Sequence, residues 1–181
     1  MILVAGLGNP GHHYHWTRHN FGFLVMDFIS AQRKLPFTKQ KFNALYTEAT
    51  LGDQDLFLIK PQTFMNLSGE SIGAFAKFYR LKAEHIVILH DDVDLDFGDV
   101  RAKNRGGTAG HHGVESVRRH LDTDVFHRIR LGVGRPKDSQ PIDVSDFVLS
   151  PFTAEEQNQL PPLYQQAATM LEKVVAGIKT S

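Results

Sequence analysis

The sequence predicts an α/β fold, a single domain spanning residues 1–181 with a mixed, mostly parallel sheet flanked by helices. Short β-rich runs alternate along the chain with segments of helical period, which favours parallel strands joined by helical crossovers. Two of these runs lie on either side of Gly52-Asp53, which indicates an antiparallel hairpin. The length of 181 residues, 41% hydrophobic and 22% charged, suits one compact globular domain.

The expected strands are runs of apolar and β-branched residues bounded by turn residues. They cover residues 2–7, 44–50, 56–60, 86–90, 100–103 and 126–133. The first helix is predicted by Phe21, Leu24, Val25, Phe28 and Ile29, which lie three and four residues apart and so share one face. The same spacing predicts helices around residues 72–79, 114–121 and 163–178.

The start of the last helix carries two signals. Thr153 and Glu156 have the spacing of a capping box, which opens a helical region. Pro161 and Pro162 follow, and proline inside a helix removes a hydrogen bond. We therefore expect this region to be broken there, with the main helix starting at the two prolines.

Composition excludes several classes of protein. The chain has no cysteine, so it can form no disulfide, no thiolate zinc site and no cysteine nucleophile. A reducing compartment, by default the cytoplasm, is the expected location. The apolar start lacks the basic residues of a signal peptide, and no apolar run approaches the roughly 20 residues of a membrane helix. We expect no membrane association.

The formal net charge of zero hides an asymmetry along the chain. The segment 84–99 holds acidic residues and no lysine or arginine, whereas the segment 101–137 is strongly basic. A folded face carrying the basic segment attracts phosphates at long range, which makes nucleic acid a plausible partner. Scattered, solvated arginines are the plainer explanation.

Gly6-Leu-Gly-Asn-Pro-Gly11 follows the first strand and matches the pattern of a dinucleotide-binding loop. That loop needs a helix to begin at once, so that helix amides face a pyrophosphate. Here Pro10 has no N–H and the first helical period comes later, which favours a sharp turn over a cofactor loop. Asn9 still lies at the carboxyl edge of the sheet, where α/β folds place ligands.

The run Thr17-Arg-His-Asn20 precedes the first helix. Thr17 or Asn20 can be a helix cap. His19 lies before the apolar stripe, so the pattern does not require it to be a core residue. A neutral imidazole is suited to take a proton from water at physiological pH.

Lys60-Pro-Gln-Thr-Phe-Met-Asn-Leu-Ser-Gly69 is a second strand end that leads into a helix. We interpret Ser68 as the cap of that helix. Asn66 offers an amide donor and an acceptor at the same sheet edge as Asn9. Such a side chain can hold a carbonyl or the oxyanion that develops from it.

A cluster of acids ends the apolar strand near residue 90. Asp92, Asp94 and Asp96 have the spacing of calcium-loop ligands, but Phe97 replaces the loop glycine and Lys103 the final glutamate, which excludes an EF-hand. A two-metal hydrolase stays conceivable, although no helical pair of metal ligands is present. We expect those three aspartates to form a solvated turn. Asp91 is placed to accept a hydrogen bond from a histidine and fix its tautomer.

The basic, glycine-rich run from Arg101 to Gly113 leads into the third helix. Glycines before a helix N-terminus offer amides to an anion. Positive charge comes from Lys103, Arg105, Arg128, Arg130, Arg135 and Lys137. We interpret this run as a binding loop in preference to a mobile surface loop.

Taken together and in this order, these runs resemble the bacterial peptidyl-tRNA hydrolase family over essentially the whole chain. Further matches are Gly110-His-His-Gly113 and Arg128-Ile-Arg-Leu-Gly-Val-Gly-Arg-Pro136. The resemblance implies a three-layer domain with a twisted sheet. It also implies a monomeric, cofactor-free and metal-independent esterase that releases peptides from tRNAs dropped by stalled ribosomes.

Position by position, the resemblance implies that His19 is the catalytic histidine and Asp91 the carboxylate that orients it. Asn66 and Asn9 match the asparagines that hold the water and the peptidyl group. The implied substrate and tRNA contacts are Tyr14, Phe64, Met65, Asn66, Lys103, His112 and Arg130, and further candidate contacts are Arg105 and His111. His112 departs from the asparagine usual in the family, which puts the role of that position in doubt.

The expected reaction is attack of a water, deprotonated by His19, on the ester between a peptide and the 3′ ribose of tRNA. The expected partner is peptidyl-tRNA, bound through its acceptor stem, its 3′ end and its peptide. Two alternatives stay open: a catalytically silent RNA-binding protein on the same fold, and a nucleotide-dependent oxidoreductase.

Overall fold

The computed structural model describes residues 1–139 and 141–180, and within them a sheet of seven strands forms the centre of the molecule. In chain order the strands are β1 (Ile2–Gly6), β2 (Lys39–Lys41), β3 (Ala44–Leu51), β4 (Gln54–Pro61), β5 (Ile86–Asp92), β6 (Val100–Lys103) and β7 (His127–Gly132). Their order across the sheet is β2-β3-β4-β1-β5-β7-β6. The four central strands are parallel, and the edge strands pair antiparallel. The predicted mixed, mostly parallel sheet is confirmed.

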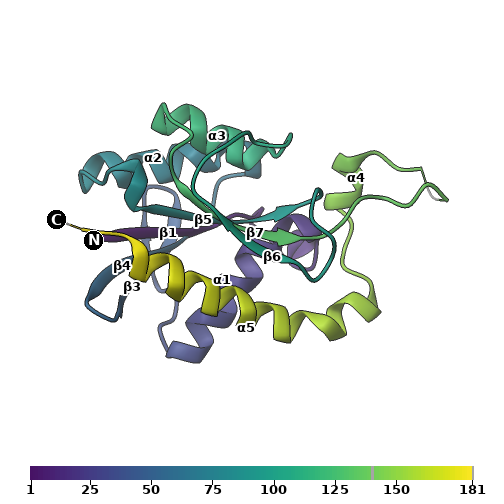
Figure 1. The fold of residues 1–181 in the computed structure, drawn as a ribbon, viewed down its shortest axis with the longest axis horizontal. Coiled ribbons are helices and arrows are strands. Elements are labelled where there is room, and N and C mark those ends of the chain that lie inside the picture. The colour runs from purple at the N-terminus through teal and green to yellow at the C-terminus, as the bar shows by residue number, and fades with distance from the viewer. Residues whose placement is uncertain (140, 181) are drawn as a thin grey trace.

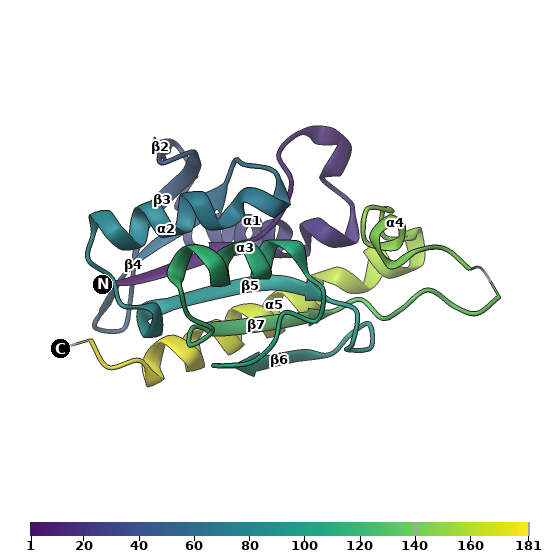
Figure 2. The same cartoon turned by 90° about the horizontal axis from the view of Figure 1, so that it is seen from above.

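Helices cover both faces of the sheet. They are α1 (Phe21–Arg33), α2 (Ser68–Phe78), α3 (His112–Leu121), α4 (Val144–Val148) and α5 (Ala154–Gly177). Figure 1 shows α2 and α3 above the sheet and α1 and α5 below it, so the fold has three layers. In Figure 2, α4 lies beyond the carboxyl ends of the central strands. None of the described helices is long and apolar enough to span a bilayer.

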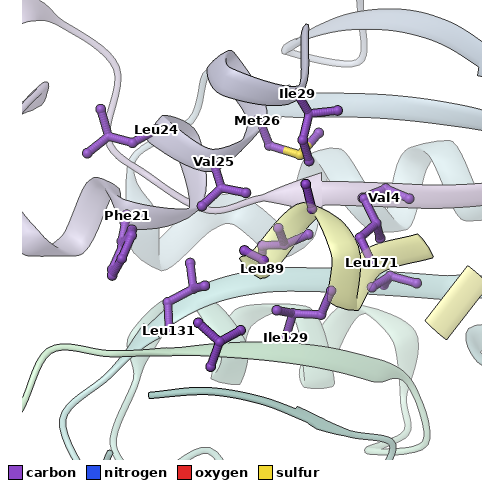
Figure 3. Packing of buried hydrophobic residues seen from close by; sticks show 14 of the residues in the cluster. Val4, Phe21, Leu24, Val25, Met26, Ile29, Leu89, Ile129, Leu131 and Leu171 are labelled. Carbon is purple, nitrogen blue, oxygen red and sulfur yellow. The ribbon is translucent and has the colours of Figure 1, made fainter. Parts of the chain in front are cut away.

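The apolar start of the chain forms β1, which is buried on both faces. Ile2 and Val4 belong to the cluster that packs against α1 and α5, which Figure 3 shows. Leu3 and Ala5 alternate with them and belong to the cluster under α2 and α3. A central parallel strand covered on both sides is apolar at every position, which explains this continuous run.

The elements agree with the predicted ones, with a few differences. The Gly52-Asp53 hairpin is confirmed, because Leu51 pairs with Gln54 and leaves a two-residue turn. Sequence reasoning missed β2 and α4. The strand β2 is Lys-Gln-Lys, which has no apolar alternation and owes its conformation to pairing with β3 at the sheet edge.

The predicted break at Pro161 and Pro162 is wrong, because both lie inside the continuous helix α5. The prolines remove the hydrogen bonds that their N–H groups would give four residues back. Other contacts of the helix offset this loss. Thr153 and Glu156 form the predicted capping box, and Leu160 is buried in the core.

The predicted cap at Ser68 is also wrong. A 3₁₀ turn, η3 (Met65–Leu67), leads directly into α2, so Ser68 is already helical and its buried hydroxyl has no partner among the described residues. The amide of Gly69 is instead bound by the hydroxyl of Ser116, at 2.9 Å. The start of α2 is thus capped by a side chain of α3.

Gly22 lets α1 lie directly on the sheet, where a Cβ would stand 2.6 Å from the amide nitrogen of Leu7 and closer still to the carbonyl oxygen of Leu89. Gly22→Ala is expected to lower the free energy of unfolding by about 1–3 kcal/mol or more, because backbone atoms of two strands must shift. Urea denaturation measures the change. Gly177→Ala is the control, since a Cβ there meets nothing within 4 Å; equal losses in both variants would contradict the close approach.

Candidate active site

A histidine and an aspartate meet at the carboxyl edge of the sheet. His19 lies in the 3₁₀ turn η2 (Arg18–Asn20) before α1, and Asp91 is near the end of β5. The His19 Nδ1 lies 3.0 and 2.9 Å from the two Asp91 carboxylate oxygens. Because the carboxylate only accepts, Nδ1 carries the proton and Nε2 keeps a lone pair. His19 lines a cavity of about 400 Å³.

Arg18 fixes the turn that carries His19. Its buried guanidinium lies 4.2 Å from the ring centre of Phe147 and donates to the Glu156 carboxylate at 2.9 Å. It also donates to the carbonyl of Pro151, at 3.2 Å. These contacts tie η2 to α4, to α5 and to the segment between them.

His111 is a second donor to Asp91. Its Nδ1 accepts hydrogen bonds from the amides of Gly113 and Val114, at 3.1 and 3.3 Å, and so caps α3. A ring nitrogen that accepts from amides carries no proton, so the proton of the neutral ring is on Nε2. That Nε2 lies 2.8 Å from the Asp91 Oδ1. Both ring nitrogens of His111 are therefore engaged inside the protein, while the residue also lines the cavity beside His19.

His19 and His111 together control the ionisation of Asp91, and Asp91 in turn controls that of His19. Burial raises the pKa of Asp91, but the charges and hydrogen bonds of His19 and His111 outweigh it and hold that pKa well below its usual range. Burial lowers the pKa of His19, but the charge and hydrogen bond of Asp91 outweigh it and raise that pKa above 6.5. His90, which donates to the carbonyl of Asp91 at 2.7 Å, is fully buried, and burial lowers its pKa to about 3. Asp91 is therefore ionised and His90 neutral.

The ligand atoms of His19, Asp91 and His111 lie within 4.8 Å of one another, which is close enough to suggest a metal site. Metal binding would need a lone pair on the His111 Nε2, and that atom carries the proton because the Nδ1 accepts from two amides. The tautomer of His111 favours a hydrogen-bonded cluster over a metal centre.

Asn9 and Asn20 form a second polar group at this edge. The Asn9 Oδ1 accepts from the amide of Met65 at 2.7 Å, which leaves its Nδ2 as an unbonded donor among the described residues. Asn20 accepts from the Asn9 backbone amide at 2.8 Å and donates to the Asn9 carbonyl at 2.9 Å. The Thr17 hydroxyl donates to the carbonyl of Tyr14 at 2.8 Å. Neither Thr17 nor Asn20 caps a helix through its side chain, so the cap interpretation is wrong.

The predicted apolar contacts gather next to Asn9. The ring of Tyr14 meets that of Phe64 edge to face, with centroids 6.5 Å apart. Phe64 is 56% exposed, and Met65 is buried beside it. Asn66 is exposed in η3, and no hydrogen bond joins its side chain to the rest of the described chain. The structure brings Tyr14, Phe64 and Met65 together with Asn9 and leaves Asn66 free at the surface.

The basic residues lie where β6 and β7 meet. Arg101 stands opposite Arg130, and Lys103 opposite Arg128. Lys103 and Arg105 are exposed. Arg130 donates to a carboxylate oxygen of Asp92 at 2.7 Å and stays 23% exposed. This edge of the sheet therefore carries charge that is accessible to solvent.

Two expectations for this region are wrong. Asp92 is buried and bonded to Arg130, not solvated, although Asp94 and Asp96 are exposed as expected. Arg128 is buried and donates to the carbonyls of Gly107 and Asp124, so it supports the loop and adds no surface charge.

The helix amides expected to bind an anion are engaged by the protein itself. The amides of Gly113 and Val114 at the start of α3 are bonded to the His111 ring. The preceding loop lines the cavity beside His19 through Thr108, Ala109 and Gly110. His112 is exposed and also lines that cavity.

Comparison with known proteins agrees with this geometry. A family model described as peptidyl-tRNA hydrolase matches residues 3–181. The chain belongs to the peptidyl-tRNA hydrolase family. It is 41% identical over 175 residues to a peptidyl-tRNA hydrolase of Clostridium botulinum (strain Alaska E43 / Type E3), covering 97% of this chain and 90% of the relative. It is 43% identical over 173 residues to that of Geotalea uraniireducens (strain Rf4), covering 96% and 89%.

Solved structures show the same fold. The crystal structure of peptidyl-tRNA hydrolase from Acinetobacter baumannii aligns with a TM-score of 0.88 and 34% sequence identity, covering 98% of this chain and 89% of that one. The resemblance deduced from the motifs is thus confirmed for the family and for the three-layer α/β fold.

Sequence reasoning on this peptidyl-tRNA hydrolase family member missed the roles of two residues. These are the bonds of Asn20 to the backbone of Asn9 and the bond of His111 to Asp91. One signal was available for Asn20: the backbone groups of Asn9, just beyond β1, need partners once the strand has ended. For His111, the capping geometry depends on how the glycine loop folds, and spacing does not specify that.

Proposed function

We propose that this protein hydrolyses the ester bond between the peptide and the 3′ ribose of peptidyl-tRNA. The observation that carries the proposal is the buried His19–Asp91 pair, which places the lone pair of the neutral His19 ring on Nε2, in a residue that lines a cavity. Family membership over nearly the whole chain supports the same activity. Such an enzyme recycles tRNA from stalled or aborted translation.

The reaction needs a base to deprotonate water, a hydrogen-bond donor to the developing oxyanion and a hydrogen-bond donor to the peptide. The His19 Nε2 takes a proton from water while the water oxygen attacks the ester carbonyl. The carbonyl oxygen becomes an oxyanion, for which the Asn66 amide is the proposed donor. The C–O bond to the ribose then breaks, and the 3′ oxygen takes the proton from His19. The products are a tRNA with a free 3′ hydroxyl and a peptide carboxylic acid, which loses its proton to solvent and becomes a carboxylate.

Asn9 and the aromatic residues are the proposed peptide contacts. The Asn9 Nδ2 is a donor with no partner among the described residues, so it suits a peptide carbonyl. Tyr14, Phe64 and Met65 lie beside it and offer apolar surface. A site that makes a hydrogen bond to the peptide group and has no partner for a free ammonium group would bind unblocked aminoacyl-tRNA more weakly.

The basic edge of the sheet is the proposed tRNA contact. Lys103 and Arg105 are exposed, and Arg130 retains exposed surface beside its bond to Asp92. Arginine and lysine contact phosphates, and this binding weakens as salt rises. His112 lies on the cavity wall nearer His19 and is a proposed contact to the substrate's 3′ end. We further propose that the protein acts as a single-domain monomer in the cytoplasm.

A catalytically silent RNA-binding protein is not favoured. Binding alone does not need a buried histidine whose tautomer is fixed by a carboxylate, and the relatives described above carry the name of a hydrolase. A nucleotide-dependent oxidoreductase is excluded by the same family match, and the loop after β1 leads into 3₁₀ turns in place of an α-helix.

The test is ester release from an N-acetylated aminoacyl-tRNA and from its unblocked form, both with EDTA present. We expect cleavage of the blocked form only, with the same rate with and without EDTA. Tight binding of the tRNA without cleavage would favour the RNA-binding alternative. Loss of activity with EDTA would show that a metal is required.

The pH dependence follows from the raised pKa of His19. Only the neutral ring accepts a proton, so kcat/KM is expected to rise with pH through the pKa of His19, which Asp91 raises above 6.5. The rate is therefore still rising at pH values where an unperturbed histidine is already neutral. Initial rates at constant ionic strength, corrected for spontaneous ester hydrolysis, give the midpoint. A midpoint at or below 6.5 would mean that another group is the base.

A further inference from the structure

Asn20 is placed to hold Asn9 in its working position. Its side-chain amide makes two hydrogen bonds to the backbone of Asn9, accepting from the N–H at 2.8 Å and donating to the C=O at 2.9 Å. Asn20 is 2% exposed, and both polar groups of its side chain are engaged in this pair. No other residue of the chain has this relation to Asn9, as far as the structure describes it.

The side chain of Asn9 is oriented by a third bond. Its Oδ1 accepts from the amide of Met65, which fixes the side-chain amide so that its Nδ2 is the remaining donor. With the backbone held by Asn20 and the oxygen held by Met65, every other hydrogen-bonding group of Asn9 is engaged. The direction of the Nδ2 donor thus depends on Asn20.

Asn20 and His19 are neighbours on one 3₁₀ turn and point to different strand ends. His19 is bonded to Asp91 of β5, and Asn20 is bonded to Asn9, just after β1. The amide of Phe23 also bonds to the carbonyl of Leu7, at 3.1 Å, so the loop after β1 runs along the start of α1. One rigid turn therefore sets the position of the base relative to that of the Asn9 donor.

We infer that Asn20 is a positioning residue for hydrolysis, which acts through Asn9 by fixing its Nδ2 donor relative to the His19 base. The inference rests on the proposed function. Misplacing a substrate-binding group by about 1 Å can cost about 10²-fold in rate. Without Asn20, the two backbone groups of Asn9 lose their partners and the loop after β1 can move away from the turn.

A double-mutant cycle tests this coupling, with kcat/KM for an N-acetylated aminoacyl-tRNA as the readout. Asn9→Ala is expected to lower kcat/KM by about 10²–10³-fold, the loss typical of one removed hydrogen-bond donor. Asn20→Ala is expected to lower it by about 10²-fold. The variant with both changes is expected to stay within about threefold of Asn9→Ala, because residues that act through one contact do not add. The acid limb of the pH profile should be unchanged, since the His19–Asp91 pair is untouched.

Thr17→Val is the matched control, because Thr17 is also buried near this turn and loses one side-chain bond to a backbone carbonyl, that of Tyr14. Whatever the factor by which Thr17→Val lowers kcat/KM, the double variant with Asn9→Ala should show the product of the two single-variant factors. If Asn20→Ala fails to fold, Asn20→Asp keeps the shape and the acceptor, and it replaces the donor to the Asn9 carbonyl by an oxygen that also brings negative charge. The same cycle then applies.

The outcomes separate the two proposals. A wild-type protein that cleaves the substrate, with Asn20 and Asn9 effects that multiply, would overturn the inference and leave the proposed function standing. A wild-type protein that releases no peptide would overturn both. A shift of the acid limb in Asn20→Ala would mean that Asn20 acts through His19 and not through Asn9.

Discussion

Replacing His19 by alanine is expected to lower kcat for hydrolysis of an N-acetylated aminoacyl-tRNA by about 10²–10⁴-fold, the usual contribution of a positioned general base. The Nε2 of His19 is the proposed proton acceptor at the wall of the cavity, and no other ring in the cluster can replace it. His111 has both nitrogens engaged, and His90, whose Nε2 atom is buried, has a pKa lowered to about 3 by burial and by the charge of His111, which makes it too weak a base. Single-turnover measurements with saturating enzyme isolate the chemical step.

His120→Ala is the matched control. His120 is exposed on α3 and bonds to a carbonyl of its own helix, so its loss removes an imidazole without touching the site. Its kcat is expected to equal that of the wild type. Turnover close to wild type in His19→Ala would remove His19 from the mechanism, whereas equal losses in both variants would point to a general effect of removing histidine.

The pairing of His19 with Asp91 was implied by the family resemblance, and the topology explains it. Asp91 lies near the end of β5, and His19 lies in the connection from the adjacent parallel strand β1 to α1. The carboxyl ends of parallel strands meet at one edge, so polar residues placed there come together. The fold class was predictable for a similar reason, since period and alternation determine which face of each element is buried.

Other features were not predictable because they depend on contacts between distant parts of the chain. Asp92 is buried because Arg130 of the neighbouring strand reaches it, and the spacing of acids in one segment contains no information about that partner. The continuous α5 depends on burial of Leu160 against the core, which a local proline rule does not weigh. The roles of Asn20 and His111 likewise follow from loops whose paths are set by the packed structure.

Replacing Asp91 by asparagine is expected to lower kcat by about 10²–10⁴-fold, close to the effect of removing His19 itself. An amide has one accepting oxygen, but two ring N–H groups face this position. The tautomer of His111 is fixed by the amides of Gly113 and Val114, so its Nε2–H retains the oxygen. The new NH₂ group then stands in the Oδ2 position, 2.9 Å from the His19 Nδ1, where it favours a ring nitrogen that accepts over one that donates to the shared Oδ1 at 3.0 Å, so the His19 proton moves to Nε2. The base loses its lone pair on the side of the cavity.

Asp91→Asn is also expected to move the proton of the His19 ring, which a merely structural role of Asp91 would not require. Long-range ¹H–¹⁵N spectra, which distinguish protonated from unprotonated ring nitrogens, should show the His19 proton on Nδ1 in the wild type and on Nε2 in Asp91→Asn. Adding His111→Asn should restore part of the activity, because asparagine still caps a helix but no longer donates to residue 91. The amide oxygen can then turn to His19 and return the proton to Nδ1. A double variant no more active than Asp91→Asn, with the His19 proton still on Nε2, would show that His111 does not control the tautomer.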